Sequence, residues 1–404
     1  RCSLRRLLRS TRFPVRILIF PAMRIGIDAR FYGSSGKGLG RYTERLIEAL
    51  EREDHENEYV VFLRQENFDE YRPISGRFTK VRADYAWYGF AEQFLFPWQL
   101  WRTGLDLMHF PHFNVPILYP GRFVVTIHDL ILLRYPTVRN TTHVALRYWC
   151  KFLVYRMVIR IACLRAGTVI AVSRFTESDL LREFPFLAGK LRVTLEGVNQ
   201  TCFFVDAGTS YALLDRLGLL SSSSRHPRPA LCRDIIRPYF LYVGNAYPHK
   251  NLERLADMAG YFPEYRFVLV GREDYFYDRL KRNVSSGNLR FTGFLSDEEI
   301  SVLYRYGTAY VFPSLYEGFG LPPLEAMSYG LPVLSSDRGS LPEVLGDAAL
   351  YFDPEKPAQL VSCLRTVAVK PSLRASLREK GYRRIRLFRW SDMAKRTIAI
   401  YRMS

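Results

Sequence analysis

Short apolar runs alternate along the chain with longer segments in which apolar residues recur every three or four positions. The runs occupy residues 59–63, 107–110, 123–127 and 168–172 in the first half, and residues 239–243, 267–270, 309–312 and 332–334 in the second. Near-continuous apolar runs are typical of parallel strands buried on both faces. Between them, segments such as residues 40–53 have the spacing of amphipathic helices. The pattern predicts an α/β protein with two doubly wound parallel sheets.

A polar stretch separates the two series of strands. It contains four serines at 221–224 and the sequence RHPRP at 225–229, without periodicity, as expected for a linker or a surface insertion. The predicted organisation is an N-terminal domain, a linker or insertion, a C-terminal domain and a final helix. These parts cover residues 24–205, 206–238, 239–385 and 386–404.

Residues 1–22 form a basic N-terminal extension with six arginines and no acid. A basic start before a short apolar stretch is typical of a signal peptide, but Arg16 interrupts the apolar part. A flexible basic tail and upstream sequence translated from a misplaced start are the two alternatives. Because Met23 opens a strand pattern, we expect it to be the natural first residue.

Composition narrows the class of protein. A chain of 404 residues, with 48% hydrophobic and 24% charged residues, suits a soluble protein of two domains. The longest apolar run falls short of the ~18 residues of a membrane-spanning helix, which excludes an integral membrane protein. Six scattered cysteines without a C-x-x-C pair predict reduced thiols and a cytoplasmic location. The net charge of +18 favours anionic partners such as nucleotide phosphates or lipid headgroups.

Candidate chemistry follows the predicted strands, since open α/β sheets bind ligands at the carboxyl ends of their strands. The loop YGSSGKGLGRY contains Gly36, Gly38 and Gly40 before a helix, which suits a phosphate, although a flexible turn is the alternative. It matches neither a Walker A nor a G-x-G-x-x-G motif. His128, in TIHDL, comes after the run 123–127 and could contact a ligand or be structural.

Two loops in the second half carry charges. In GNAYPHKNL, Lys250 precedes a helix N-terminus, where a positive charge is unfavourable unless an anion lies between them. Lys250 is therefore a candidate diphosphate ligand, with a solvated lysine as the alternative. In SLYEGFGLPPLEAM, glycines free the backbone before a proline-started helix. Glu317 and Glu325 are predicted to point into one cleft and to accept hydrogen bonds from sugar hydroxyls. A helix-dipole role for Glu325 would leave Glu317 unexplained.

The segment EGFGLPPLE, with seven residues between Glu317 and Glu325, resembles the signature of the large family of retaining glycosyltransferases with the GT-B fold. The resemblance covers residues 23–402 and includes GRYTERL, THDL, AVSRFTESDL, GNAYPHKNL, TGFLSDEEI and SLPEV in this order. It implies two Rossmann-like domains facing a cleft, with the final helix crossing back to the first domain. It also implies hexose transfer from a nucleotide sugar to a glycan or lipid-linked acceptor in cell-surface polysaccharide assembly.

The resemblance further implies that no cofactor or metal is needed. GDP-mannose is the expected donor and a UDP-sugar the alternative, because GNAYPHKNL and EGFGLPPLE look most like segments of mannosyltransferases. Many relatives carry Arg where this chain has His249, which exchanges a permanent charge for a titrating group.

The resemblance assigns roles residue by residue. Glu325 would bind ribose hydroxyls, Lys250 the diphosphate, and Gly293–Leu295 would lie near the base. Glu317, His128 and Lys250 are the candidate catalytic residues. The expected donor-binding residues are Gly36, Gly38, Gly40, Gly244, His249, Lys250, Gly293, Phe294, Leu295, Glu317, Gly318, Phe319, Gly320, Leu321 and Glu325.

Four alternative functions are a binding protein without catalysis, an epimerase, a phosphorylase and a nucleic-acid-binding protein. A nucleotide-sugar or glycan-binding protein without catalysis is disfavoured by the joint presence of His128, Lys250, Glu317 and Glu325. A GT-B-fold epimerase is a second alternative. A phosphorylase would need a cofactor lysine that we do not identify. A nucleic-acid-binding protein is disfavoured because the sequence contains no basic–aromatic recognition module.

Residues 142–165 contain basic residues among large apolar ones and no acid. Spacings of four, five, four and five predict that the charges lie along one helical stripe. Such a stripe suits an anionic membrane surface and predicts peripheral association with the inner face of the plasma membrane. A helix packed on the first sheet, with solvated arginines, is the alternative. The basic residues are Arg147, Lys151, Arg156, Arg160 and Arg165.

Overall fold

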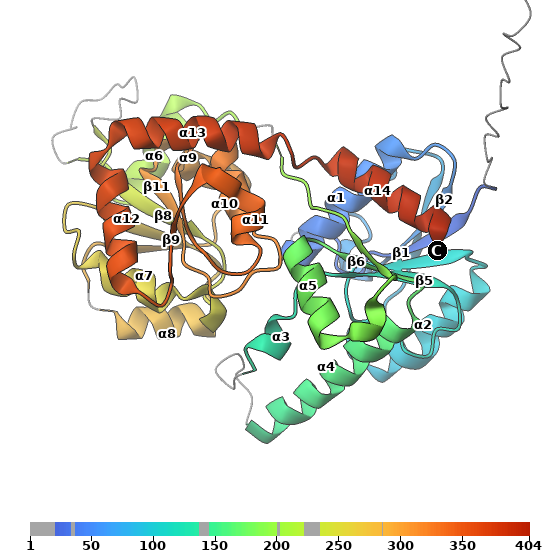
Figure 1. Ribbon diagram of the computed structural model, residues 1–404. Coiled ribbons are helices and arrows are strands. Elements are labelled where there is room, and N and C mark those ends of the chain that lie inside the picture. The colour runs from blue at the N-terminus through green and yellow to red at the C-terminus, as the bar shows by residue number, and fades with distance from the viewer. Residues whose placement is uncertain (1–20, 34–36, 137–144, 200–202, 222–234, 285) are drawn as a thin grey trace, which may run out of the picture.

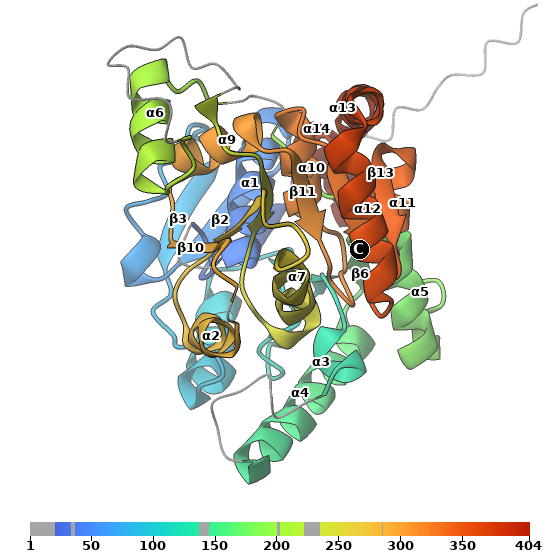
Figure 2. The ribbon, with the colours of Figure 1, turned by 90° about the vertical axis from the view of Figure 1, so that its left-hand side faces the viewer.

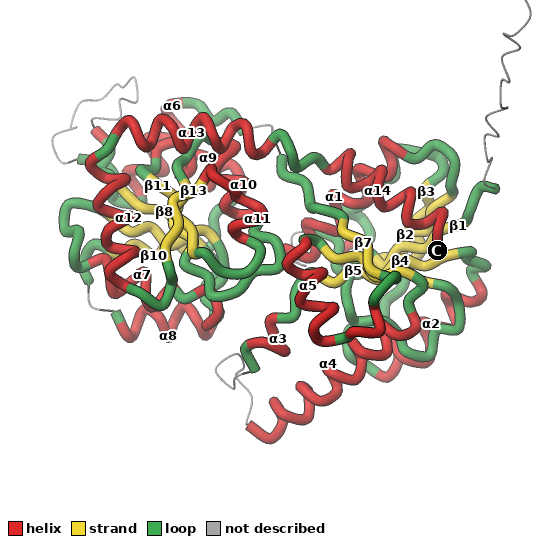
Figure 3. The backbone as a smooth tube through the Cα atoms, viewed as in Figure 1, coloured by secondary structure: helices red, strands yellow, loops and turns green. Residues whose placement is uncertain are grey.

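The structure is a computed structural model that describes residues 21–33, 37–136, 145–199, 203–221, 235–284 and 286–404. Most of the predicted N-terminal extension lies outside these residues. Each of two domains has a parallel sheet at its centre with helices on both faces (Figures 1 and 3). The predicted class, α/β with two doubly wound sheets, is confirmed.

The first sheet has seven strands in the order β3-β2-β1-β4-β5-β6-β7, so the strand order reverses between β1 and β4. The four apolar runs predicted in this half all form strands. The edge strands β3 and β7 were not predicted because their sequences, FTKVR and LRV, are partly exposed and polar. The strands are β1 (Arg24–Asp28), β2 (Glu58–Leu63), β3 (Phe78–Arg82), β4 (Leu107–Phe110), β5 (Phe123–Ile127), β6 (Thr168–Ala171) and β7 (Leu191–Val193).

The second sheet repeats this arrangement with six strands in the order β10-β9-β8-β11-β12-β13, reversing between β8 and β11. All pairings between its neighbouring strands are parallel. Ligands bind open α/β sheets at such reversals, outside the carboxyl ends of the strands. The strands are β8 (Tyr239–Val243), β9 (Arg266–Val270), β10 (Leu289–Gly293), β11 (Ala309–Phe312), β12 (Val333–Ser336) and β13 (Ala349–Phe352).

Helices cover both sheets, and none of the described helices is both long enough and apolar enough to cross a bilayer. Around the first sheet lie α1 (Lys37–Glu53), α2 (Phe90–Arg102), α3 (Ile131–Arg134), α4 (Ala145–Arg165) and α5 (Arg174–Glu183). The remaining helices are α6 (Ala207–Arg216), α7 (Leu252–Ala259), α8 (Tyr275–Asn283), α9 (Asp297–Tyr306), α10 (Leu321–Ser328), α11 (Leu341–Leu345), α12 (Pro357–Val369), α13 (Pro371–Ile385) and α14 (Trp390–Met403).

Helix α6 lies within the segment predicted to be a linker. The Asp206 carboxylate accepts hydrogen bonds from the backbone N–H groups of Gly208 and Thr209 and so caps the helix. Leu213 and Leu214 are buried in the core of the second domain. The predicted linker or insertion therefore contains a helix at residues 207–216, which the sequence did not predict because the polar residues that follow it dominate the pattern.

Helix α14 packs against α1 of the first domain, although it follows the whole second domain in sequence (Figure 1). Met393, Ile398 and Tyr401 are buried in the same core as Leu46 of α1. The Tyr401 hydroxyl also lies 2.6 Å from Nδ1 of the buried His109, at the middle of the first sheet. The core of the first domain therefore includes side chains from the last helix.

Candidate active site at the domain junction

Lys250 and Glu317 meet where the strand order of the second sheet reverses. Lys250 ends a 3₁₀ turn after β8, and Glu317 lies in the loop after the neighbouring strand β11. Lys250 Nζ is 2.6 Å from Glu317 Oε1, and the two side chains are 14% and 10% exposed. A nearly buried ion pair at this position offers a cation to a phosphate and a carboxylate to hydroxyl groups.

The backbones of the two loops are tied together. The backbone N–H of Leu315 donates to the His249 carbonyl (2.7 Å). Asn251 adopts a left-handed conformation (φ 58°), and its side-chain amide donates to the Pro313 carbonyl (3.2 Å). These bonds fix the backbone on both sides of the Lys250–Glu317 pair, so that the pair is held by the fold and not only by its own charges.

A third loop, which the sequence did not predict to act here, supports the backbone of Glu317. The N–H of Ser340 donates to the Glu317 carbonyl (3.1 Å), and its hydroxyl donates to the Phe319 carbonyl (2.8 Å). Gly339 (φ +63°) approaches so closely that a Cβ atom there would lie 2.7 Å from the Glu317 carbonyl oxygen. Only a glycine fits this position without strain. Ser340 begins the segment SLPEV, which the sequence marks only as part of the resemblance.

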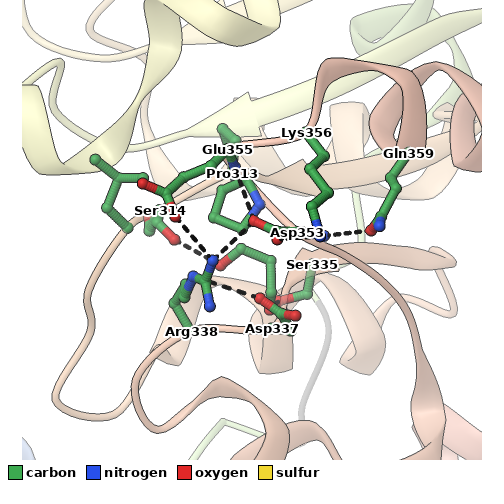
Figure 4. A network of polar contacts seen from close by, with 12 residues as sticks. Pro313, Ser314, Ser335, Asp337, Arg338, Asp353, Glu355, Lys356 and Gln359 are labelled. Carbon is green, nitrogen blue, oxygen red and sulfur yellow. Dashed lines mark hydrogen bonds and ion pairs between the residues drawn. The ribbon is translucent and has the colours of Figure 1, made fainter.

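Arg338 braces this supporting loop against the loop after β13 (Figure 4). Its Nη2 lies 2.8 Å from Asp353 Oδ1 and 3.0 Å from Glu355 Oε2. The Arg338 side chain is 37% exposed, so these ion pairs add modestly to stability. Their geometric effect is to join the ends of β12 and β13 behind the Glu317 loop.

His128 approaches the junction from the first domain, after β5. Its Nε2 lies 2.9 Å from the Pro111 carbonyl oxygen, and its Nδ1 lies 3.1 Å from Glu196 Oε1. Burial lowers the pKa of His128, but the hydrogen bond and the charge of Glu196 outweigh this effect, and the net pKa lies above its ordinary value. With acceptors at both nitrogens, the imidazolium form fits the site. Glu196 was not predicted from the sequence.

The two domains touch at Gly318. A Cβ atom on this residue would lie 1.8 Å from the His128 carbonyl oxygen, so any side chain would force the domains apart. The Ser173 hydroxyl donates to the Gly318 carbonyl (2.6 Å), and the Thr176 hydroxyl lies 3.1 Å from the same oxygen. The glycine turn between the two predicted carboxylates is thus a docking point between domains.

Glu325 is held by Arg41, which lies in α1 of the first domain. The distance from Arg41 Nη1 to Glu325 Oε1 is 2.9 Å, and Arg41 Nη2 lies 2.8 Å from Asp297 Oδ1. Burial raises the pKa of Glu325, and the positive charge of Arg41 opposes this rise without cancelling it. A ligand that uses Glu325 therefore has to share it with Arg41 or displace Arg41.

The predicted glycine loop is only partly described. Gly36 lies outside the described residues, and Gly38 faces open space in the first turn of α1. A Cβ atom on Gly40 would lie 2.1 Å from the Gly33 carbonyl oxygen and 2.4 Å from that of Phe31. Gly40 thus allows α1 to pack against the preceding loop. Phosphate binding by these glycines stays a prediction.

His249 is buried in the turn that leads to Lys250. Burial, reinforced by the neighbouring charge of Lys250, lowers the pKa of His249 to about 4. The residue is therefore neutral near pH 7. The replacement of the expected arginine by His249 removes a positive charge from this turn.

The other predicted donor-binding residues lie in the second domain, after β8, at and after the end of β10, and directly before α10. Gly244 follows β8, and Gly293 (φ +72°) ends β10. Phe294 is exposed, whereas Leu295 is buried. Gly320 (φ +96°) directly precedes α10, which begins at Leu321, and the ring of Phe319 packs against Phe388. Within the described residues, no group of three or more His, Cys, Asp or Glu side chains is placed to hold a metal ion.

Comparison with known families matches both halves of the chain. The family described as Glycosyltransferase Family 4 matches residues 36–201, and the family described as Glycosyl transferases group 1 matches residues 235–384. The chain is 29% identical over 314 residues to the O-antigen chain mannosyltransferase B of Escherichia coli, covering 74% of each chain. It is 24% identical over 265 residues to the O-antigen chain mannosyltransferase RfbU of Salmonella typhimurium, covering 64% of each.

Solved structures share the fold at lower identity. A sucrose-phosphate synthase from Thermosynechococcus elongatus superposes with a TM-score of 0.72 at 21% identity, covering 94% of this chain and 98% of that one. The Anabaena protein HepE, in complex with UDP and glucose, superposes with a TM-score of 0.69 at 16% identity, with the same coverage. These likenesses confirm the two-domain architecture of the GT-B type.

Proposed function

Because the chain is a glycosyltransferase of the group 1 and family 4 type, we propose that it transfers a mannosyl residue from GDP-mannose to a glycan or lipid-linked acceptor in the assembly of a cell-surface polysaccharide. The names of the O-antigen mannosyltransferase relatives support this sugar and this setting. The observation that carries the proposal is the Lys250–Glu317 pair at the strand-order reversal, next to the first domain.

In the proposed reaction, the diphosphate of the donor lies beside Lys250 and the backbone N–H groups of residues 318–321, which precede the two prolines at the start of α10. Both are fixed donors that stabilise negative charge as the nucleoside diphosphate leaves. Glu317 exchanges its contact with Lys250 for hydroxyl groups of the donor sugar. The acceptor hydroxyl attacks the anomeric carbon on the face from which the diphosphate departs and passes its proton to an oxygen of the departing diphosphate, so the C–O bond to the diphosphate breaks as the new one forms and the configuration is retained.

His128 supplies a second positive charge in this proposal, from the first domain. Its raised pKa favours the imidazolium form near neutral pH, with Glu196 and the Pro111 carbonyl holding the ring. Glu325 binds the ribose hydroxyls after Arg41 releases or shares its carboxylate. No step in this scheme is routed through a metal ion.

A panel of nucleotide sugars tests the choice of donor. We expect GDP-mannose to raise the melting temperature of the protein most and to give slow release of GDP in the absence of acceptor. UDP-glucose is the matched competitor, because HepE, a protein of the same fold, was solved in complex with UDP-glucose. Stronger stabilisation by UDP-glucose, or release of UDP alone, would contradict the proposed donor but not the transferase activity.

The proposed location is the cytoplasm, at the inner face of the plasma membrane, where a lipid-linked acceptor would be presented. The free cysteines among the described residues, Cys150, Cys163 and Cys363, are consistent with a reducing compartment. Binding to a membrane can be measured with lipid vesicles, without donor or acceptor, and so independently of sugar transfer.

A further inference from the structure

Helix α2 buries Glu92, Phe96 and Leu100 on its inner face and exposes further large apolar side chains on its outer face. The outer face of a surface helix normally carries polar residues. Glu92 is fully buried, whereas five large apolar side chains are 54–87% exposed. With about 100° of rotation per residue, most of them fall within one quarter of the helix surface. The five exposed side chains are Phe90, Phe94, Leu95, Trp98 and Trp101.

A buried polar network fixes α2 in this orientation. Glu92 Oε1 lies 2.7 Å from Arg30 Nη2 and accepts a hydrogen bond from Asn114 Nδ2 (2.8 Å). Arg30 also binds Asp28, at the end of β1 (2.7 Å). Turning the aromatic side chains inward would remove Glu92 from a buried arginine. The outward aromatic face is therefore a fixed feature of the fold.

Helix α4 extends this surface. Its exposed apolar strip includes Leu153, Met157 and Leu164. The prediction of a single basic stripe is wrong, because each five-residue step turns by about 140° around the helix. Instead, Arg156 and Arg160 lie on one side of the apolar strip, and Lys151 and Arg165 lie on the other. The side chain of Arg147 lies outside the described residues.

The two helices are joined by the segment around Ile117. The N–H of Ile117 donates to Gln93 Oε1 of α2 (2.9 Å), and its carbonyl accepts a hydrogen bond from Arg165 of α4. The neighbouring Leu118 is 50% exposed. Both views place α2 and α4 along the same side of the first domain (Figures 1 and 2). We call the exposed side chains of α2, Leu118 and α4 the α2–α4 face.

The charge of the α2–α4 face is positive. The only acid of α2 is buried, and the sequence of α4 contains none. The guanidinium of Arg102 lies 4.6 Å from the centre of the Trp98 ring, so a cation sits within the aromatic patch itself. Arg156 Nη2 lies 4.0 Å from Glu183 Oε1 of α5, which balances part of this charge, and α2 and α4 themselves present no exposed acid. Exposed aromatic rings mixed with an excess of basic side chains match the interface of a bilayer that carries anionic lipids.

We propose that the α2–α4 face docks on an anionic phospholipid bilayer. The aromatic side chains of α2 enter the interface, and the basic side chains of α4 approach the headgroups. This inference deepens the proposed function and rests on it for the biological purpose of docking. A lipid-linked acceptor would lie in the same bilayer.

Vesicle flotation tests the docking in the absence of donor and acceptor. We expect the protein to float with vesicles of phosphatidylcholine and phosphatidylglycerol, but not with phosphatidylcholine alone, and salt to weaken binding. The fluorescence of exposed tryptophans should shift to shorter wavelength on binding. Absence of binding to the anionic vesicles, or binding that survives both high salt and reversal of the basic charges, would overturn the proposal.

Two double variants test the two components. Trp98→Ala with Trp101→Ala, and Arg156→Glu with Arg160→Glu, should each weaken binding by about tenfold or more, since each basic side chain near the lipid contributes roughly fivefold. Unchanged circular dichroism confirms that the variants fold. Matched exposed residues elsewhere, in Tyr261→Ala and in Arg365→Glu with Arg386→Glu, should leave binding unchanged.

Three further outcomes separate this inference from its alternatives. If the tryptophan pair instead breaks a dimer seen by light scattering, and no vesicle binding is found, the face is an interface between copies and the proposal is wrong. If the wild-type protein does not bind anionic vesicles but releases GDP from GDP-mannose, the docking proposal is wrong and the proposed function stands. Retained vesicle binding without release from any nucleotide sugar refutes the proposed function alone.

Discussion

Both sheets carry a charged cluster near their strand-order reversal, but the two clusters differ in their access to solvent. In the second domain, the side chains of Lys250 and Glu317 keep 14% and 10% of their surface exposed. In the first, Arg30 and Glu92 are fully buried with Asp28. An accessible pair can exchange its partner for a ligand, whereas a sealed pair orients a helix. Sheet topology thus sets the position of the charges, and burial sets their use.

Removal of Lys250 should have the largest effect on activity. Loss of a fixed donor for the leaving group typically lowers the rate by about 10²–10³-fold, so Lys250→Ala should nearly abolish transfer. The free energy of unfolding should change by less than about 2 kcal/mol, less than for a sealed pair, because Glu317 keeps contact with solvent after Lys250 is removed. Donor turnover and urea denaturation measure the two effects. Lys356→Ala, which removes an exposed lysine near Asp353, is the control and should leave turnover unchanged.

Removal of Arg30 should lower the stability of the fold more than the removal of Lys250 does. Arg30→Ala leaves two carboxylates buried without their cation, which should lower the free energy of unfolding by about 3–5 kcal/mol. The urea midpoint of the first domain measures this loss. Arg77→Ala removes an exposed arginine and should be almost neutral. A loss for Arg30→Ala below about 1 kcal/mol would show that the sealed cluster does not stabilise the fold.

Glu325→Gln should weaken donor use while preserving the fold. The amide keeps the size of the side chain but loses the charge that Arg41 contacts and that accepts hydrogen bonds strongly from ribose. We expect a rise of about tenfold in the KM for the donor, since a hydrogen bond to a charged group contributes roughly 1.5–3 kcal/mol. Steady-state kinetics measure it. An unchanged KM would remove Glu325 from the donor site.

The smallest predicted effect is a change in pH dependence on removal of Glu196. Because the folded pKa of His128 is raised, the stability linked to its protonation is present below the unfolded pKa of about 6.5 and is lost as pH rises through the folded value. In Glu196→Gln the pKa of His128 should fall. Transfer should then decline at a lower pH than in the wild-type protein. Glu58→Gln, at an exposed position at the start of β2, should keep the wild-type profile.

The sequence predicted best what depends on local pattern. Central strands were found because apolar residues follow one another where both faces are buried. The edge strand β3 was missed because it alternates with polar residues, and α6 because the polar stretch after it dominated the pattern. The outward aromatic face of α2 could not be predicted, since helical spacing of apolar residues normally indicates burial.

In the candidate site, too, the sequence predicted only the residues that belong to a local pattern. Lys250 and Glu317 were predicted as candidates because each lies in a distinctive loop after a strand. Glu196 is 68 residues from His128 in sequence, and Ser340 lies 23 residues from Glu317. Neither stands in a local pattern that points to its partner. The contacts that hold the site together depend on the sheet order, which spacing along the chain does not encode.

Helix α14 gives the first domain an unusual order of assembly. Tyr401 and its partner His109 are 292 positions apart, and the whole second domain is translated between them. As the chain leaves the ribosome, the face of α1 that includes Leu46 waits without α14 until residues 390–403 have been made. The first domain therefore cannot complete its folding strictly in the order of synthesis, which is the usual route for N-terminal domains. Its final packing is coupled to the synthesis of its neighbour.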